Sequence, residues 1–213
     1  ALTDRRSPSW LKLYNSGNFF DPRSIPPQDY QAIAALCTEH GATRVVVENH
    51  PKFGADRLRH FRDLLDAQLE VAVGLETVQP RWLDRLGKQM SRDRFEGYAR
   101  WLQNLGVDLR VFLILGVPGV SVRESIRWAR LSVRYAAAFQ ARHISVIPAR
   151  SGEGWGGLAD QLPRFSSSDL LEVQRAAIKD ADRRAAVTID LWDLDASDQH
   201  FAKLHQVNLS QAF

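Results

Sequence analysis

The sequence predicts an α/β fold built from repeated βα units. Short apolar runs, too short to be globular helices, alternate with longer segments whose apolar residues recur at helical spacing. The run at residues 69–77 ends in glycine and a carboxylate, as buried strands do when both faces of a sheet are covered and the strand ends at a site. Right-handed crossovers at this spacing give either an open doubly wound sheet or a barrel.

Six segments have the composition of strands. They are residues 10–14, 44–47, 69–77, 109–115, 143–147 and 186–191. The expected helices are residues 28–40, 55–67, 81–105 with a break at 87–88, 121–139 and 168–182. Ser121, followed three residues later by Glu124, has the pattern of a capping box. We expect one domain over residues 1–195 and a tail over 196–213 that forms a short helix and then irregular chain.

Composition limits the class of protein. The chain has 213 residues, 45% hydrophobic and 25% charged, and can bury a sizeable core. Its one cysteine, Cys37, rules out a disulfide framework or a cysteine-only metal cage within this chain, so a reducing, cytoplasmic setting is expected. It has no apolar run long enough to span a membrane. The net charge of +3 permits an anionic ligand or nucleic acid without requiring one.

Polar or glycine-containing clusters follow all six expected strands. They are residues 14–18, 48–50, 76–77, 116–119, 148–152 and 190–193. In both doubly wound sheets and barrels, ligands bind beyond the carboxyl ends of parallel strands. The clusters therefore predict a ligand site at that edge of the sheet, although loops also need glycine, proline and asparagine for their turns.

Glu76 and Glu48 each end a buried run, and several roles are open to them. Glu76 could hydrogen-bond a ribose diol or an ammonium group, act as a general base, or cap a nearby helix. If the two carboxylates share a pocket, they could serve as a general acid and base. Neither a Walker loop nor the dinucleotide-binding glycine fingerprint is present, and Trp155 and Trp192 could stack on a flat ligand.

The clusters resemble the radical S-adenosylmethionine superfamily, in particular the branch that contains the Elongator catalytic subunit and the archaeosine-synthase radical partner. The matching segments, in order, are residues 12–20 (KLYNSGNFF), 47–51 (VENHP), 73–77 (VGLET), 86–88 (LGK), 112–118 (FLILGVP), 146–152 (VIPARSG), 190–193 (DLWD) and Asn208. The resemblance extends over nearly the whole chain.

This resemblance implies a partial (β/α)6 TIM-like barrel with parallel strands that lacks the first βα unit. Such enzymes hold a [4Fe–4S] cluster and S-adenosylmethionine and cleave the sulfonium reductively to a 5′-deoxyadenosyl radical, which abstracts a substrate hydrogen. It also implies a small-molecule, nucleotide or tRNA substrate and a reductant such as flavodoxin or ferredoxin. In this chain the implied cofactor-binding residues are Asn15, Ser16 and Gly17 (methionyl amino group), Glu76 (ribose), Gly116, Pro118, Ile147 and Arg150 (adenine), Glu48 facing the same cavity, and Tyr14.

One departure from the superfamily is large. Its cluster is held by three cysteines in a CxxxCxxC-like loop after the first strand, and this chain has no such loop. We expect that loop to lie upstream, so that this chain is a fragment that is inactive alone. The alternatives are a cluster-less barrel that binds S-adenosylmethionine or a nucleotide, and an ordinary α/β-barrel lyase or isomerase using Glu48 and Glu76.

Overall fold

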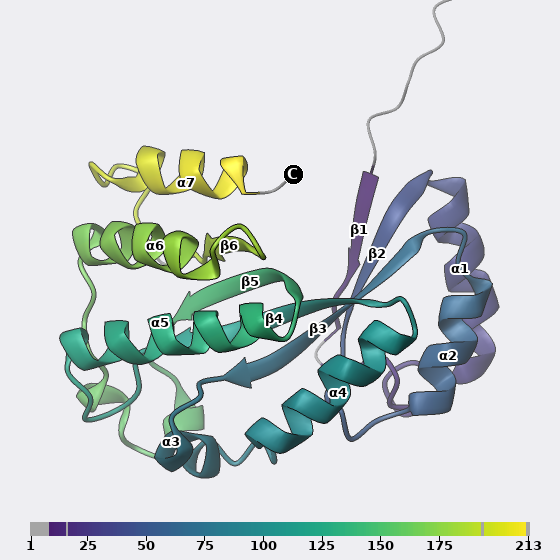
Figure 1. Cartoon of the computed structure of the whole chain (residues 1–213), viewed down its shortest axis with the longest axis horizontal. Coiled ribbons are helices and arrows are strands. Elements are labelled where there is room, and N and C mark those ends of the chain that lie inside the picture. The colour runs from purple at the N-terminus through teal and green to yellow at the C-terminus, as the bar shows by residue number, and fades with distance from the viewer. Residues whose placement is uncertain (1–8, 16, 193, 212–213) are drawn as a thin grey trace, which may run out of the picture. The chain divides into compact units, whose positions relative to one another are not determined.

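The computed structural model describes residues 9–15, 17–192 and 194–211. Its six strands form one sheet in the order of the sequence, β1-β2-β3-β4-β5-β6 (Figure 1). The strands are β1 (Ser9–Leu13), β2 (Ala42–Glu48), β3 (Gln68–Glu76), β4 (Asp108–Leu115), β5 (Ala141–Pro148) and β6 (Ala186–Ile189).

The strand order decides between the two sheet types that the sequence left open. A doubly wound sheet reverses its strand order at a switch point, whereas here every strand neighbours the next one along the chain. The ladders β1–β2, β2–β3 and β5–β6 are parallel. The fold class is therefore α/β with the topology of a partial (β/α)6 TIM-like barrel, as predicted.

The helices follow the predicted pattern closely. They are α1 (Tyr30–Glu39), α2 (Ala55–Leu64), α3 (Pro80–Arg85), α4 (Arg92–Asn104), α5 (Val122–Ala138), α6 (Ser167–Ala181) and α7 (Phe201–Ser210), with 3-10 turns at Pro27–Asp29, Glu153–Trp155 and Ala159–Gln161. The break at residues 87–88 separates α3 from α4. At the start of α5 the Ser121 side chain accepts a hydrogen bond from the Glu124 N–H, as the predicted cap requires.

The chain divides into two compact units, which are described separately. Unit 1 comprises the residues up to 73 together with 97–109, and unit 2 comprises residues 74–96 and those from 110 onward. Unit 1 is centred on an aromatic cluster of Phe19, Phe20, Tyr30 and Phe61, whose ring centroids lie 4.8–6.2 Å apart. All four side chains are buried. They fix the loop after β1 against α1 and α2.

In unit 2 the C-terminal helix α7 packs beside α6 and β6 (Figure 1). Asn208 of α7 is the main polar link, because its side chain accepts from the Ile189 N–H at 2.9 Å and donates to the Ile189 carbonyl at 2.8 Å. Gln174 of α6 donates to the same Asn208 amide oxygen at 2.7 Å. Across the described ranges, no helix is both long and apolar enough to cross a membrane.

Candidate ligand site at the carboxyl ends of the strands

In unit 1 the ends of β1 and β2 bring two predicted segments together. Leu13 pairs with Val47, so the residues that follow, Tyr14 and Glu48, lie level at the same edge. Beyond them, the side-chain oxygen of Asn15 is buried and has no hydrogen-bond partner among the described residues. A buried acceptor without a donor is unusual in folded proteins and commonly marks a place for a ligand or water.

The glycine in this loop has a local structural reason. A Cβ atom on Gly17 would lie 2.6 Å from Ser24 Oγ, so a larger residue would displace the Ser24 side chain. Tyr14 is 45% exposed and Glu48 is half-buried. The predicted site residue Ser16 lies outside the described residues.

Two asparagines tie the loops after β1 and β2 together. The Asn49 side chain accepts from the Phe20 N–H and donates to the carbonyls of His50 and Phe53. The Asn18 side chain accepts from the His50 N–H at 2.6 Å. Asn49 is buried, and both the oxygen and the nitrogen of its side-chain amide are used in these structural hydrogen bonds. These asparagines therefore hold the loop on which Asn15 lies.

In unit 2 the end of β3 is strained at Glu76. Its φ is +65°, in the left-handed region that costs an L-residue about 1–2 kcal/mol. The Thr77 N–H donates to the Leu75 carbonyl at 2.8 Å, which makes Glu76 the centre of a tight three-residue turn of the rare, strained γ type. The Glu76 side chain is only 10% exposed. Strain of this kind is typical of functional sites.

Two other residues accommodate the Glu76 carboxylate. A Cβ atom on Gly74 would lie 2.6 Å from Glu76 Oε1, so Gly74 leaves the space into which the carboxylate folds back. Lys88, in the loop between α3 and α4, donates a hydrogen bond from Nζ to the same Oε1 atom. The carboxylate is therefore nearly buried, positioned and paired with one cation.

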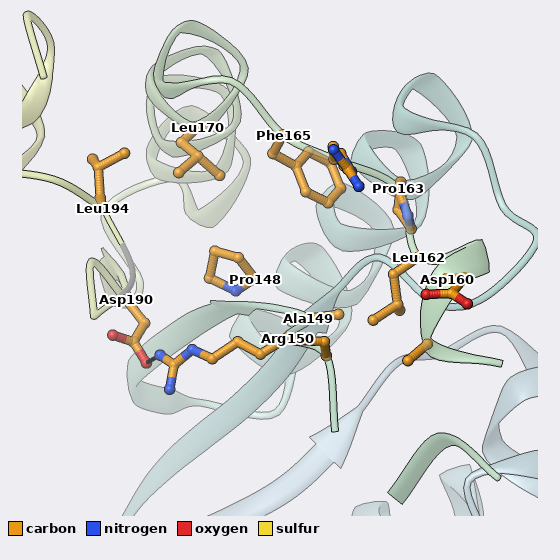
Figure 2. A pocket seen from close by; sticks show the side chains of 13 residues that line it. Pro148, Ala149, Arg150, Asp160, Leu162, Pro163, Phe165, Leu170, Asp190 and Leu194 are labelled. Carbon is orange, nitrogen blue, oxygen red and sulfur yellow. Dashed lines mark hydrogen bonds and ion pairs between the residues drawn. The ribbon is translucent and has the colours of Figure 1, made fainter. Parts of the chain in front are cut away.

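A pocket of about 560 Å³ lies at the ends of β5 and β6 in unit 2 (Figure 2). Arg150, which lines it, forms an ion pair with Asp190 at 2.6 Å, and its guanidinium lies 5.4 Å from the centre of the Trp192 ring. The indole N–H of Trp155 donates to the Arg150 carbonyl at 2.7 Å. The pocket has the volume of a small-molecule site.

The other predicted residues of unit 2 are placed differently. Gly116 has a φ of +93°. A Cβ atom at this position would lie 2.8 Å from Pro163 Cγ and 2.9 Å from Phe165 Cε2. The space beside it is therefore filled by this chain, and the structure gives Gly116 a packing role. Pro118 is buried, and Ile147 is half-buried near the end of β5. Contacts of these three residues with adenine remain predictions.

No protein-family model matches the chain. A curated relative, the uncharacterized protein MJ0550 of Methanocaldococcus jannaschii, is 22% identical over 147 residues, which cover 68% of this chain and 40% of the relative.

Several solved structures, among them the next three, match with TM-scores above 0.5. Streptococcus suis SuiB bound to S-adenosylmethionine has a TM-score of 0.56 at 13% identity over 78% of this chain and 44% of SuiB. Methanocaldococcus infernus Elp3 has 0.57 at 14% over 69% of this chain and 35% of Elp3. Escherichia coli coproporphyrinogen III oxidase, described as a radical SAM enzyme, has 0.55 at 12% over 87% of this chain and 44% of the oxidase.

The chain has the fold of the radical S-adenosylmethionine enzymes. The fold that the resemblance predicted is thus confirmed, and Elp3 is one of the structures that share it. The chain spans less than half the length of the curated relative and of each of these three structures.

The residues present fit one of the two cofactors of this fold. Asn15 Oδ1 is an unused acceptor, which suits an ammonium group such as that of a methionyl moiety. The Glu76 carboxylate offers further acceptor positions, which suit the hydroxyls of a ribose. Asn15 in unit 1 and Glu76 in unit 2 therefore each offer a hydrogen-bond acceptor of a kind that suits one part of S-adenosylmethionine.

The [4Fe–4S] cluster does not fit the residues of this chain. Such clusters are held by cysteine thiolates, and Cys37 is the chain's one cysteine. It is buried in α1, and burial raises the pKa of its thiol. Within the described ranges, no group of three or more histidine, cysteine, aspartate or glutamate side chains could hold a metal ion.

In unit 1 the structure brings the ends of β1 and β2 together. In unit 2 the predicted residue Arg150 lines the pocket, whose lining does not include Glu76, Gly116, Pro118 or Ile147. Glu48 belongs to unit 1 and Glu76 to unit 2, so their convergence in one pocket stays a prediction. Two residues that contact predicted site residues in the structure were not themselves predicted: Lys88, which pairs with Glu76, and Asp190, which pairs with Arg150. Both lie in segments that the family resemblance included, but their pairing with Glu76 and Arg150 depends on tertiary structure.

Proposed function

We propose that this chain forms the S-adenosylmethionine-binding wall of a radical SAM enzyme whose cluster ligands come from outside the chain. The intact enzyme would cleave S-adenosylmethionine reductively and use the 5′-deoxyadenosyl radical to abstract a substrate hydrogen. The fold supports this proposal, and the strained, nearly buried Glu76 at the end of β3 is the observation that carries it. A reductant such as flavodoxin or ferredoxin and a small-molecule, nucleotide or tRNA substrate belong to the proposal.

Each residue in the proposal has a role that matches its environment. Asn15 would accept a hydrogen bond from the methionyl ammonium group, since its oxygen has no partner among the described residues. Glu76 would accept hydrogen bonds from the ribose hydroxyls. The pocket beside Arg150 would receive the adenine end, where the guanidinium is already oriented by Asp190.

The proposal is tested by titrating the ¹⁵N-labelled chain with S-adenosylmethionine. Binding should move the backbone amide signals of Glu76 and Thr77. Glu76→Gln should weaken binding about tenfold, the effect of losing a charge-assisted hydrogen bond of roughly 1.4 kcal/mol. Asn15→Ala should also weaken it. Glu172→Gln, which changes an exposed carboxylate on α6, is the matched control and should leave the affinity unchanged.

Two results would redirect the proposal. An unchanged dissociation constant for Glu76→Gln would return Glu76 to a structural role. We expect weak binding by this chain alone, because in these enzymes the cluster normally chelates the methionyl group. Tight binding without a cluster would therefore favour the cluster-less binding barrel.

Radical chemistry is tested on a longer protein that carries the cluster loop. After anaerobic reconstitution and reduction with dithionite, it should release 5′-deoxyadenosine from S-adenosylmethionine. If no cleavage occurs at full cluster occupancy, the radical assignment is wrong, whatever the binding results.

A further inference from the structure

The Glu76 carboxylate is paired with a lysine from a different part of unit 2. Lys88 Nζ donates to Glu76 Oε1, and twelve residues separate the two in sequence. The lysine side chain is 56% exposed, whereas the carboxylate side chain is 10% exposed. Solvent therefore reaches the cation while the anion is largely withdrawn from water.

The backbone around Lys88 is shaped to direct this side chain. Its neighbours Gly87 and Gln89 both have left-handed backbones, with φ of +63° and +53°. Arg94 anchors the segment by donating from its guanidinium to the Gln89 carbonyl, and the Arg94 N–H donates to Ser91 Oγ. The loop is thus fixed to the first turn of α4 next to Lys88, whose side chain reaches Glu76.

The pairing changes what the site can bind. An unpaired carboxylate that is nearly buried attracts cations, because its charge is not offset by water. With Lys88 in place the pair is formally neutral. A carboxylate has about four acceptor positions, and the lysine bond uses only one of them. The others can accept O–H donors without adding net charge to the site.

We infer that Lys88 is a positioning and specificity-determining residue that makes the Glu76 site select uncharged hydroxyl donors, such as a ribose diol, over cationic groups. This inference rests on the proposed function, because it assumes that Glu76 contacts the sugar of a nucleoside ligand. It adds the reason why a ligand with hydroxyls is preferred to one with an ammonium group at the same place.

The test compares two nucleosides on the full chain: adenosine and 3′-amino-3′-deoxyadenosine, at a pH where the amine is protonated. The wild-type chain should bind adenosine more tightly. Lys88→Met keeps an unbranched side chain but removes the charge, and it should reverse the preference, with a change of about fivefold or more in the affinity ratio. Lys88→Arg should retain the wild-type order. Lys179→Met, at an exposed lysine of α6, is the control and should not change the ratio.

The outcomes separate the inference from the proposed function. If Glu76→Gln weakens adenosine binding but Lys88→Met leaves the affinity ratio unchanged, the inference is overturned and the proposed function stands. If neither nucleoside binds, the inference is overturned, while the proposed function is decided by the titration with S-adenosylmethionine and by the cleavage assay. A fall in stability alone would not change the ratio, so the reversal cannot come from a merely structural role of Lys88.

Discussion

The strain at Glu76 can be measured by replacing this residue with glycine and with alanine. Both substitutions remove the ion pair with Lys88, so the loss of that pair cancels in the comparison. Alanine keeps the left-handed backbone cost of about 1–2 kcal/mol, while glycine removes it. Glycine loses about 0.5–1 kcal/mol through the greater freedom of its unfolded chain. The glycine variant should therefore be more stable than the alanine variant by about 0.5–1 kcal/mol.

Urea unfolding followed by circular dichroism measures this difference, provided that the two variants share the same m value. For a chain of this length the melting temperatures should differ by roughly 2 °C, with the glycine variant higher. The same pair of substitutions at Gln68, an exposed residue in ordinary extended backbone of β3, should give the opposite order. If alanine is as stable as glycine at position 76, Glu76 is not strained and the argument for a functional site loses its physical basis.

Three further substitutions test other features of the structure. Gly74→Ala should push the Glu76 carboxylate out of place and weaken nucleoside binding. It should not lower the unfolding free energy by more than about 0.5 kcal/mol, because the displaced atoms end a flexible side chain and alanine suits a strand better than glycine. A large loss of stability would contradict this. Tyr30→Phe should raise the free energy of unfolding in urea by about 1 kcal/mol, because the buried Tyr30 hydroxyl has no hydrogen-bond partner among the described residues. A destabilised variant would show that the hydroxyl does have a hydrogen-bond partner. Burial raises the pKa of Asp180, but hydrogen bonds from Arg130 and Arg134 of α5 outweigh this effect and hold the pKa below its ordinary value of 3.8. The stability that these bonds confer is therefore present above pH 3.8 and is lost as the pH falls below it. Asp180→Asn should therefore cost about 1 kcal/mol at pH 7 and flatten the fall of stability in acid, as measured by unfolding at a series of pH values; a variant with the wild-type acid slope would refute this.

The elements could be predicted from the sequence because their signals are local. Helical periodicity and turn residues place each segment, and the strands are predominantly apolar runs. The boundary of α6 shows where this fails. Three consecutive serines, residues 166–168, can each cap a helix, and Ser166 does so because Asp169 completes the reciprocal pair with it. Periodicity alone did not give the order of the strands, since βα repeats are compatible with both sheet types. The family resemblance predicted the barrel order, and the structure confirms it.

The site was predicted only in part because its geometry is not local. Gly74 and Gly116 look alike in the sequence, since each lies at or near the end of a buried strand. In the structure Gly74 makes space for the Glu76 carboxylate, and the space beside Gly116 is filled by Pro163 and Phe165 from a distant segment. A left-handed backbone at a glutamate has no sequence signal at all, because the residue type does not favour it. The partner Lys88 likewise follows from the path of the chain after α3.

The arrangement of Gly74, Glu76 and Lys88 lowers the stability of the folded state more than the Glu76–Lys88 ion pair raises it. A glycine within a strand loses about 0.5–1 kcal/mol relative to alanine. The left-handed glutamate loses about 1–2 kcal/mol more. An ion pair whose lysine is 56% exposed returns at most about 1 kcal/mol. A strand that ended in an ordinary polar residue would be more stable, so folding alone does not explain this arrangement. Because strain of this kind persists mainly where a ligand or a reaction requires the geometry, the end of β3 is the part of this chain where binding should first be sought.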